Sequence, residues 1–199
     1  MGVRGSNNVD SCVPFLSLCD ELHGCDITAL NFVLIELESQ TLRLLNGGSE
    51  TASYSVSTAA NGAGCRENTG CTPLGWHTVD EKIGHGVERG TAFKGRRPGA
   101  ICTDLCSATD DDTITSRILW LHGSQPGYNS GGSVDSKNRY IYIHGTAQEQ
   151  LIGQPVSHGC IRMRNDDVIA LFDLLNVNTP VLISQMVIDL PGLTRPDPA

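Results

Sequence analysis

The apolar residues of this chain fall into short runs with alternating polar positions, and glycine-rich turns separate these runs. Residues 31–38 and 41–45 flank a turn at Ser39 and Gln40, which predicts a hairpin. With 22 glycines, 9 prolines and only 5% aromatic residues, the composition argues against coiled coils, collagen and long helical bundles. We therefore expect a mainly β fold. Further strand candidates are residues 54–58, 75–83, 117–121, 140–144 and 180–184.

One principal helix is predicted near the end of the sequence. Asn165 is a good N-cap, and Asp166 and Asp167 suit the positive end of a helix dipole. Val168, Phe172 and Leu175 then recur on one face, and we expect the helix to end near residues 176–178. The predicted architecture is thus a mostly antiparallel β domain with one helix packed near its end.

The length of 199 residues predicts one folded domain with short appendages. Residues 1–27 show neither strand nor helix periodicity and are interpreted as an N-terminal extension. The folded domain is expected over residues 28–186, and a Pro-rich C-terminal tail over 187–199. No run of apolar residues is long enough for a membrane span. No convincing signal peptide is visible, since the only apolar candidate, residues 12–19, is short and lies between Asp10 and Asp20.

Charge is distributed unevenly along the chain. Fourteen Lys and Arg residues against 22 Asp and Glu residues give a net charge of -8, which disfavours nucleic acid as a partner. Between Lys82 and Arg164 there are ten basic and seven acidic residues, a local charge of +3, and the remainder carries -11. This cationic middle suits a substrate that carries carboxylates, although ordinary solvated surface charge explains it equally.

The chemistry-bearing residues lie in one segment of the chain. A candidate strand runs from Tyr140 to His144, with Ile141 and Ile143 on one face and Tyr140, Tyr142 and His144 on the other. We expect His144 to emerge at the end of this strand, before Gly145. Twelve residues separate His144 from a second cluster, which consists of Ser157, His158, Gly159, Cys160 and Arg162.

These residue types suit acyl transfer through a thiolate. A free thiol is mostly protonated at neutral pH, and a nearby imidazole raises its thiolate fraction and can return the proton to a leaving amine. Glycine before the cysteine leaves the N–H groups around Gly159 and Cys160 accessible to an oxyanion. Arg162 can clamp a carboxylate. On spacing alone, a Cys/His metal site is an equal alternative, and Arg162 has a purely structural reading as a partner of Asp166 or Asp167.

Eight cysteines also leave the redox state open. Cys65 and Cys71 flank a short loop, where a local disulfide and two free thiols are both consistent with the sequence. Cys102 and Cys106 have the spacing of half a zinc site, but no second pair of ligands follows them.

At these residues the sequence resembles the YkuD-type L,D-transpeptidase family. The family signature is His-Gly-Thr, a loop, and then Ser/Thr-x-Gly-Cys-Ile/Val-Arg-Met/Leu. Here it stands as residues 144–146 and 157–163, and residues 72–75, Thr-Pro-Leu-Gly, resemble an upstream element of the family. The resemblance covers roughly residues 29–185 and implies that the domain at 28–186 is a YkuD-like β-sandwich with one principal α-helix and short helical turns.

The resemblance also implies roles for individual residues. Cys160 would be the nucleophile, His144 the general acid and base, and His158 a second imidazole that shapes the pocket or assists the thiolate. Residues implied to bind substrate or its oxyanion are Gly159, Gly145, Ser157, Arg162 and Tyr142. Neither a metal nor an organic cofactor is implied.

The implied reaction acts on the stem peptides of peptidoglycan, as donor and acceptor. Cys160 would attack the carbonyl of the L-centre at stem position 3, release the terminal D-alanine and form a thioester. A neighbouring stem would then give a 3-3 crosslink, while a free D-amino acid or a protein lysine would give exchange or attachment. Water as acceptor would give an L,D-carboxypeptidase, and another cysteine amidase on the same site is a further alternative. A non-catalytic peptide- or zinc-binding module is the remote alternative. The family further implies the periplasm or cell envelope as the location and carbapenems as inhibitors.

Overall fold

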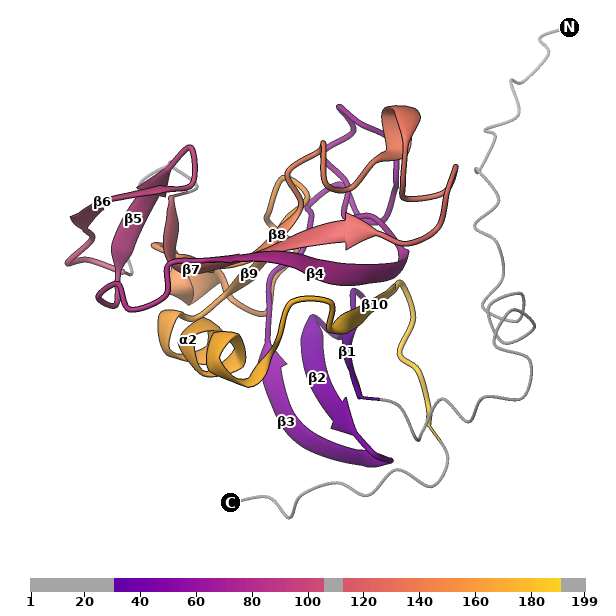
Figure 1. The fold of residues 1–199 in the computed structure, drawn as a ribbon, viewed down its shortest axis with the longest axis horizontal. Coiled ribbons are helices and arrows are strands. Elements are labelled where there is room, and N and C mark those ends of the chain that lie inside the picture. Colours follow the sequence, from indigo (N-terminus) through magenta and orange to yellow (C-terminus); the bar gives the residue numbers. More distant parts are fainter. Residues whose placement is uncertain (1–30, 106–112, 191–199) are drawn as a thin grey trace, which may run out of the picture.

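The computed structural model describes residues 31–105 and 113–190, and within these ranges strands dominate (Figure 1). A helix, α2, spans Asn165–Leu174, and short 3-10 helices occur at Gly132–Val134 and Glu149–Leu151. The strands are β1 (Phe32–Glu36), β2 (Thr41–Asn46), β3 (Ser49–Ser55), β4 (Gly75–Ile83), β5 (Thr91–Lys94), β6 (Arg97–Ile101), β7 (Ile114–Gly123), β8 (Tyr142–Thr146), β9 (Ile161–Met163) and β10 (Pro180–Ser184). The predicted mainly β class with one principal helix is confirmed.

All of these strands belong to one hydrogen-bonded sheet. Its order is β3-β2-β1-β10-β4-β7-β5-β6, and β8 pairs with both β7 and β9 outside this path. Most neighbours are antiparallel, but β1 pairs with β10 and β8 pairs with β9 in parallel. Parallel neighbours need a long crossover connection, so these two pairs bring together segments that are distant in the sequence.

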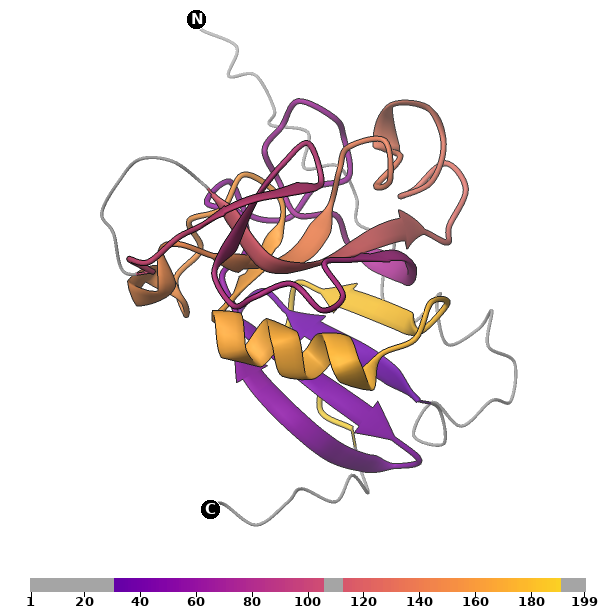
Figure 2. The same ribbon diagram turned by 60° about the vertical axis from the view of Figure 1, so that its left-hand side comes forward.

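The sheet folds over on itself around a single main core. In Figures 1 and 2, strands β1, β2 and β3 form the lower part of the molecule, while β4, β7 and β8 form the upper part. Val33 and Ile35 of β1 and Leu119 and Ile143 of β7 and β8 are fully buried in the same cluster. Helix α2 adds Val168, Leu171 and Phe172 to that cluster. The arrangement is therefore sandwich-like, with apolar side chains of both layers facing inward.

Several expected elements differ from the structure at their boundaries. The β1–β2 hairpin, β4 and β10 lie where the sequence predicts them, but β3 precedes the expected strand at 54–58. Strands β5, β6 and β9 are not among the predicted elements. The strand expected from Tyr140 begins only at Tyr142, because Tyr140 adopts a left-handed backbone with φ 58° that ends the regular alternation.

The N-cap lies one residue before the predicted position. Arg164 is the N-cap and makes no side-chain cap bond, and Asn165 is the first helical residue. The N–H of Asn165 donates instead to the Glu149 carboxylate at 2.7 Å. The helix ends at Leu174, short of the expected 176–178, but Val168 and Phe172 are buried on one face as predicted.

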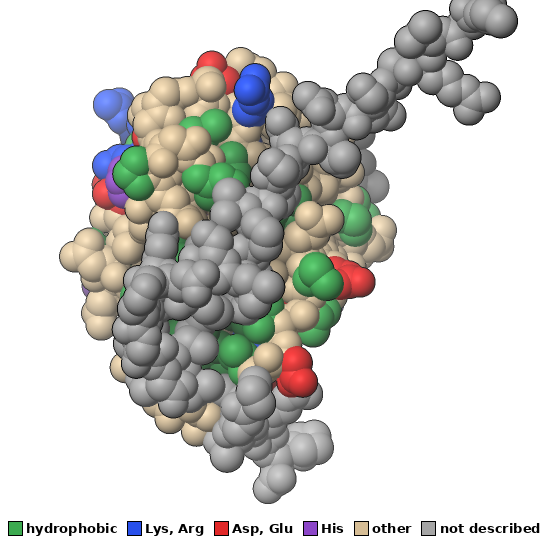
Figure 3. All heavy atoms as spheres, turned by 90° about the vertical axis from the view of Figure 1, so that its right-hand side faces the viewer, with side chains coloured by type: hydrophobic (Ala, Val, Ile, Leu, Met, Phe, Trp, Pro, Cys, Tyr) green, Lys and Arg blue, Asp and Glu red, His purple; other side chains and the backbone are tan. Residues whose placement is uncertain are grey.

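None of the helices in the described ranges is long and apolar enough to cross a membrane. On the face shown in Figure 3, hydrophobic side chains are interspersed with polar ones, and most of the Lys and Arg side chains in view lie at its upper end. On this face, the basic side chains in view thus gather at one end.

A buried histidine fastens the segment before β8 to β4. His77 is 1% exposed, and its ring nitrogens contact the Gly75 carbonyl at 3.0 Å and the Ser136 hydroxyl at 2.9 Å. Burial lowers the pKa of His77 to about 4, although the Gly75 carbonyl acts in the opposite direction. The native state therefore holds this imidazole neutral, while the unfolded chain protonates it near its ordinary pKa of 6.5.

We expect His77 to make the fold sensitive to acid. Its contribution is complete above pH 6.5 and falls as the pH drops toward about 4, by about 2–3 kcal/mol at pH 4.5. Urea unfolding at pH 7.5 and 4.5 measures this loss, and His77→Gln should lose less stability than the wild type between the two values. The exposed His85 provides the matched control. Equal acid losses in wild type, His77→Gln and His85→Gln would contradict the assignment.

Candidate active site

The parallel pairing of β8 with β9 brings the segments of the predicted catalytic residues together. His144 pairs in register with Arg162, and Ile143 pairs with Ile161. Because side chains alternate along a strand, Tyr142 and His144 share one face of β8, and Arg162 of β9 lies opposite His144. Cys160 directly precedes β9 and packs against the cluster that contains Tyr142. Ile143 and Ile161 point into the main core instead.

The imidazole of His144 is oriented by its own backbone. Its Nδ1 lies 2.8 Å from the carbonyl oxygen of Gly145. A carbonyl only accepts, so Nδ1 carries the proton and Nε2 is the basic nitrogen of the neutral ring. The expectation that His144 emerges at the end of its strand is wrong: β8 continues to Thr146, and the His144 residue is only 1% exposed. The imidazole therefore lies in a largely dry environment.

The thiol of Cys160 is half-buried and lies at the edge of a small apolar cluster. It packs against the cluster of Phe93, Ile118 and Tyr142. Its Sγ donates to the carbonyl oxygen of Tyr140 at 3.3 Å. The unusual backbone of Tyr140, with φ 58°, occurs two residues before β8 begins, beside the thiol. Strained backbone of this kind costs about 1–3 kcal/mol and concentrates at functional sites.

Two hydroxyl groups hold the turn that presents Cys160. Ser157 is buried, and its hydroxyl donates to the Cys160 carbonyl at 2.6 Å while accepting the Gly159 N–H at 3.2 Å. The buried hydroxyl of Thr72 donates to the Gly159 carbonyl at 3.0 Å. Gly159 has φ 129°, and a Cβ there would approach the Cys71 carbonyl to 3.2 Å. Glycine is thus required at this position by both backbone conformation and space.

Arg139 joins the loops around the nucleophile. Its guanidinium donates to the carbonyl oxygens of Cys65 and Cys71, each at 2.6 Å, and to that of Gly64 at 3.2 Å. Burial lowers the pKa of Arg139, and the Cys65, Cys71 and Cys160 thiols act against that shift, in this order. Arg139 therefore fastens the backbone of residues 64, 65 and 71 through its guanidinium.

A buried asparagine fixes the end of β8, just after His144. Oδ1 of Asn165 accepts from the hydroxyls of Thr115 and Ser116 at 2.6 and 2.5 Å, and its Nδ2 donates to Thr146 and Glu149 at 2.9 and 2.6 Å. A Cβ on Gly145 would lie 2.6 Å from the Thr115 carbonyl and 2.8 Å from Asn165 Oδ1. The close packing of β8 against β7 at this point thus depends on a glycine.

The remaining predicted residues divide between the interior and the surface. Arg162 is 3% exposed and donates to Gln148 Oε1 at 3.1 Å, so it lies inside the protein beside His144. Tyr142 is also buried, and its hydroxyl accepts from Arg96 at 3.3 Å. Burial is the main cause that raises the pKa of Tyr142. His158 is exposed on the turn before the nucleophile.

The cysteine alternatives are partly resolved. Cys71 carries a free thiol, so the local disulfide with Cys65 is not formed in this structure. Cys102 is also a free thiol, whereas Cys12, Cys19, Cys25 and Cys106 lie outside the described residues. Within residues 31–105 and 113–190, no three His, Cys, Asp or Glu side chains gather in the way a metal ion would need.

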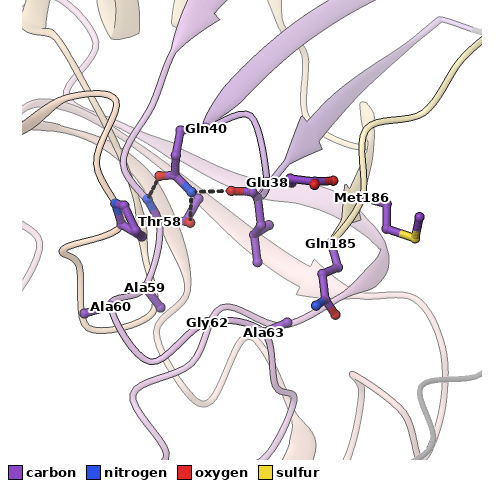
Figure 4. A pocket seen from close by; sticks show the side chains of 11 residues that line it. Glu38, Gln40, Thr58, Ala59, Ala60, Gly62, Ala63, Gln185 and Met186 are labelled. Carbon is purple, nitrogen blue, oxygen red and sulfur yellow. Dashed lines mark hydrogen bonds between the residues drawn. The ribbon is translucent and has the colours of Figure 1, made fainter.

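A separate pocket of about 450 Å³ lies next to the nucleophile segment (Figure 4). Gln40 forms part of its wall, and its amide nitrogen donates to the Thr58 hydroxyl at 2.7 Å and to the Leu37 carbonyl at 2.6 Å. The neighbouring Ala59 pairs with Ser157 through a β-bridge. None of the predicted catalytic residues lines this pocket, so it is distinct from the candidate active site.

Sequence reasoning does not identify Arg139, Arg96 or the full role of Asn165. Arg139 stands only five residues before His144, but a lone arginine beside a strand carries no signal of its partners. Thr72 belongs to the Thr-Pro-Leu-Gly element of the sequence. Its hydroxyl bond to Gly159, which only the structure shows, connects this element to the turn before Cys160. Asn165 is recognisable as a helix-start residue, and its four side-chain contacts come from segments that only the fold brings together.

We expect Gly145→Ala to disturb both stability and the site. The new methyl group meets backbone at 2.6 Å, so β8 must shift and His144 moves with it, at a cost of about 1–3 kcal/mol. Urea unfolding and the rate of Cys160 alkylation by iodoacetamide, followed by peptide mapping, measure the two effects. Gly99→Ala is the control, since its Cβ meets its nearest neighbour at an ordinary 3.4 Å. Equal behaviour of the two variants would show that the packing at Gly145 does not position His144.

Comparison with known proteins gives one consistent family. The family model of the L,D-transpeptidase catalytic domain, YkuD, matches residues 31–183. The putative L,D-transpeptidase YqjB of Bacillus subtilis is 28% identical over 153 residues, which cover 77% of this chain and 70% of that protein. The probable L,D-transpeptidase ErfK/SrfK of Escherichia coli is 48% identical over 61 residues, but these cover only 30% of this chain and 18% of that protein.

Solved structures of L,D-transpeptidases are more distant. L,D-transpeptidase 3 from Mycobacterium tuberculosis, in complex with a faropenem-derived adduct, matches with a TM-score of 0.49 and 15% sequence identity. The match covers 78% of this chain and 60% of that one. The family assignment therefore rests on the sequence model, which spans most of the described residues and both halves of the candidate site. The chain belongs to the YkuD L,D-transpeptidase catalytic-domain family.

Proposed function

We propose that this protein is a cysteine-dependent L,D-transpeptidase that acts on peptidoglycan stem peptides through a thioester. The observation that carries the proposal is the parallel pairing of β8 with β9, which sets His144 opposite Arg162, while Cys160, the residue before β9, packs against the cluster that contains Tyr142 of β8. The Nδ1 contact of His144 with Gly145 leaves Nε2 as the base. The location that agrees with this substrate is the periplasm or cell envelope.

The first half-reaction forms the thioester. Nε2 of His144 takes the proton of the Cys160 thiol, and the thiolate attacks the carbonyl carbon of the L-centre at stem position 3. The bond from that carbon to the nitrogen of the terminal D-alanine breaks, and the imidazolium returns its proton to the leaving amine. We place the main oxyanion donor at the Cys160 N–H, since the Gly159 N–H is directed toward Ser157. That the Gly159 N–H is a second donor to the oxyanion stays a prediction.

The second half-reaction transfers the acyl group. An amine from a neighbouring stem attacks the thioester carbon, loses a proton to His144, and expels the Cys160 thiolate. The product is a 3-3 crosslink, and a free D-amino acid or a protein lysine as acceptor gives exchange or attachment by the same steps.

Arg162 has a structural part in this proposal. Its side chain is buried and bonded to Gln148, so it supports the strand pairing around His144 and does not bind substrate from solvent. The exposed His158 is placed at the rim, where it shapes the entrance of the site. Ser157 fixes the backbone of Gly159 and Cys160, and Gly145 allows the close packing of β8 against β7 beside His144.

Incubation with a tetrapeptide stem, with and without an amine acceptor, tests the reaction. Wild type should release D-alanine and form a crosslinked product only when the acceptor is present. Release of tripeptide alone under both conditions would favour the L,D-carboxypeptidase. No reaction in either case, together with stoichiometric zinc that is lost in Cys160→Ala and His144→Ala, would favour the metal-binding alternative.

Acylation by a carbapenem identifies the nucleophile. We expect one covalent adduct by intact-protein mass spectrometry, absent in Cys160→Ala and retained in Cys102→Ala, whose free thiol lies on the chain beyond β6. An adduct that survives Cys160→Ala would refute the assignment of the nucleophile.

His144→Ala should slow this acylation by about 10²–10⁴-fold, because the thiol loses its base. His158→Ala should have a smaller effect, since His158 is exposed at the rim of the site. Stopped-flow or quenched mass spectrometry at pH 7 measures the rates. Comparable rates in His144→Ala and wild type would overturn the assignment of the base.

A further inference from the structure

An arginine is stacked on an aromatic surface beside the thiol. The guanidinium of Arg96 lies 4.6 Å from the ring centre of Trp120 and 5.3 Å from that of Tyr140. The three rings of Trp120, Tyr140 and Tyr142 pack together, with centroids 5.8 and 5.5 Å from Trp120. We name these four residues, Arg96, Trp120, Tyr140 and Tyr142, the Arg96 shelf.

The Arg96 shelf borders the reactive atoms. Tyr142 lies on the face of β8 that carries His144, and the Tyr140 carbonyl is 3.3 Å from Cys160 Sγ. Arg96 comes from the turn between β5 and β6, a hairpin that Figure 1 shows at one end of the molecule beside β7. Phe93 of that hairpin belongs to the same cluster as Tyr142, and Cys160 packs against this cluster, which brings the hairpin near the site. The shelf is thus built from three segments that meet at the thiol.

Arg96 is held by a hydroxyl group and by aromatic rings, and the nearby carboxylate of Glu81 acts on it electrostatically. One of its N–H groups donates to the Tyr142 hydroxyl at 3.3 Å, and its guanidinium lies over the rings of Trp120 and Tyr140. Among residues 31–105 and 113–190, no carboxylate forms an ion pair with Arg96. Lys137, the other cation near Trp120, is paired with Asp80 at 2.7 Å. The donors at the edge of the Arg96 guanidinium therefore suit an external anion.

We propose that the Arg96 shelf binds the terminal carboxylate of the donor peptide, so that Arg96 determines specificity for a peptide with a free C-terminus. This inference rests on the proposed function. In the donor, the terminal carboxylate carbon is the third atom beyond the attacked carbonyl carbon, so it lies near the thiol when Cys160 attacks. The guanidinium can receive both carboxylate oxygens, while the exposed ring of Tyr140 contacts the apolar part of the terminal residue.

A pair of donor peptides tests this subsite. One tetrapeptide stem ends in a carboxylate, and the other is identical but ends in a carboxamide. Wild type should prefer the carboxylate by about 10–100-fold in kcat/KM, the range expected for one charge-assisted pair. Arg96→Gln should lose this preference, mainly through KM, and Arg96→Lys should retain part of it. Arg97→Gln is the matched control, because Arg97 is the adjacent, exposed arginine on β6.

The outcomes separate the subsite from the proposed function. If wild type reacts with neither peptide, the proposed function fails. If wild type reacts with both equally, or if Arg96→Gln and Arg97→Gln lose the same fraction of activity, the subsite is overturned. Alkylation of Cys160 by neutral iodoacetamide should change little in Arg96→Gln. A loss of alkylation as large as the loss of acylation would mean that Arg96 acts on the thiol and not on the carboxylate.

Discussion

The parallel pairing of β8 with β9 is the constraint on which the site depends. It aligns two segments whose register pairs are 18 residues apart in the sequence, and it fixes which side chains share a face. Ile143 and Ile161 bury the opposite face in the main core, so a slip by one residue would expose them and invert every side chain of the site. Hydrophobic burial thus enforces the geometry that the proposed chemistry requires.

Backbone carbonyls around the nucleophile are held by side chains from distant segments. Thr72 binds Gly159 and Arg139 binds Cys65 and Cys71 across long stretches of sequence, and Ser157 adds a local bond to Cys160. These contacts are buried or partly buried, where each hydrogen bond is stronger and each broken one leaves a costly unsatisfied group. Irregular backbone around Cys160 is therefore kept in one conformation although no regular element includes that residue.

Much of the fold can be predicted from the sequence, because strand alternation and glycine breaks report burial directly. β4 and β10 lie at their predicted residues, and the helix lies on its expected face. Tyr140 makes the sequence pattern misleading. Its side chain fits the strand alternation, but its positive φ keeps the residue out of the regular strand. The strands β5 and β6 carry too few apolar residues for a clear alternating pattern. All residues of β6 are exposed, so burial imposes no such pattern on that strand.

The site is predictable to a different extent. The cysteine, the histidine and the glycines beside them are visible in the motif, because their spacing is local. Arg96, Arg139 and Asn165 are not, because their partners lie far away in the sequence. Their significance follows from the three-dimensional arrangement of carbonyls, rings and hydroxyls, which no linear pattern encodes.

The hydroxyl of Thr72, which reaches across 87 residues to Gly159, has a consequence for how the protein acquires its reactivity. The nucleophile turn is assembled from early and late parts of the chain, so no growing fragment on the ribosome contains a complete site. Non-local contacts of this kind form late and slowly during folding. The reactivity that we propose for Cys160 therefore depends on completion of the native state.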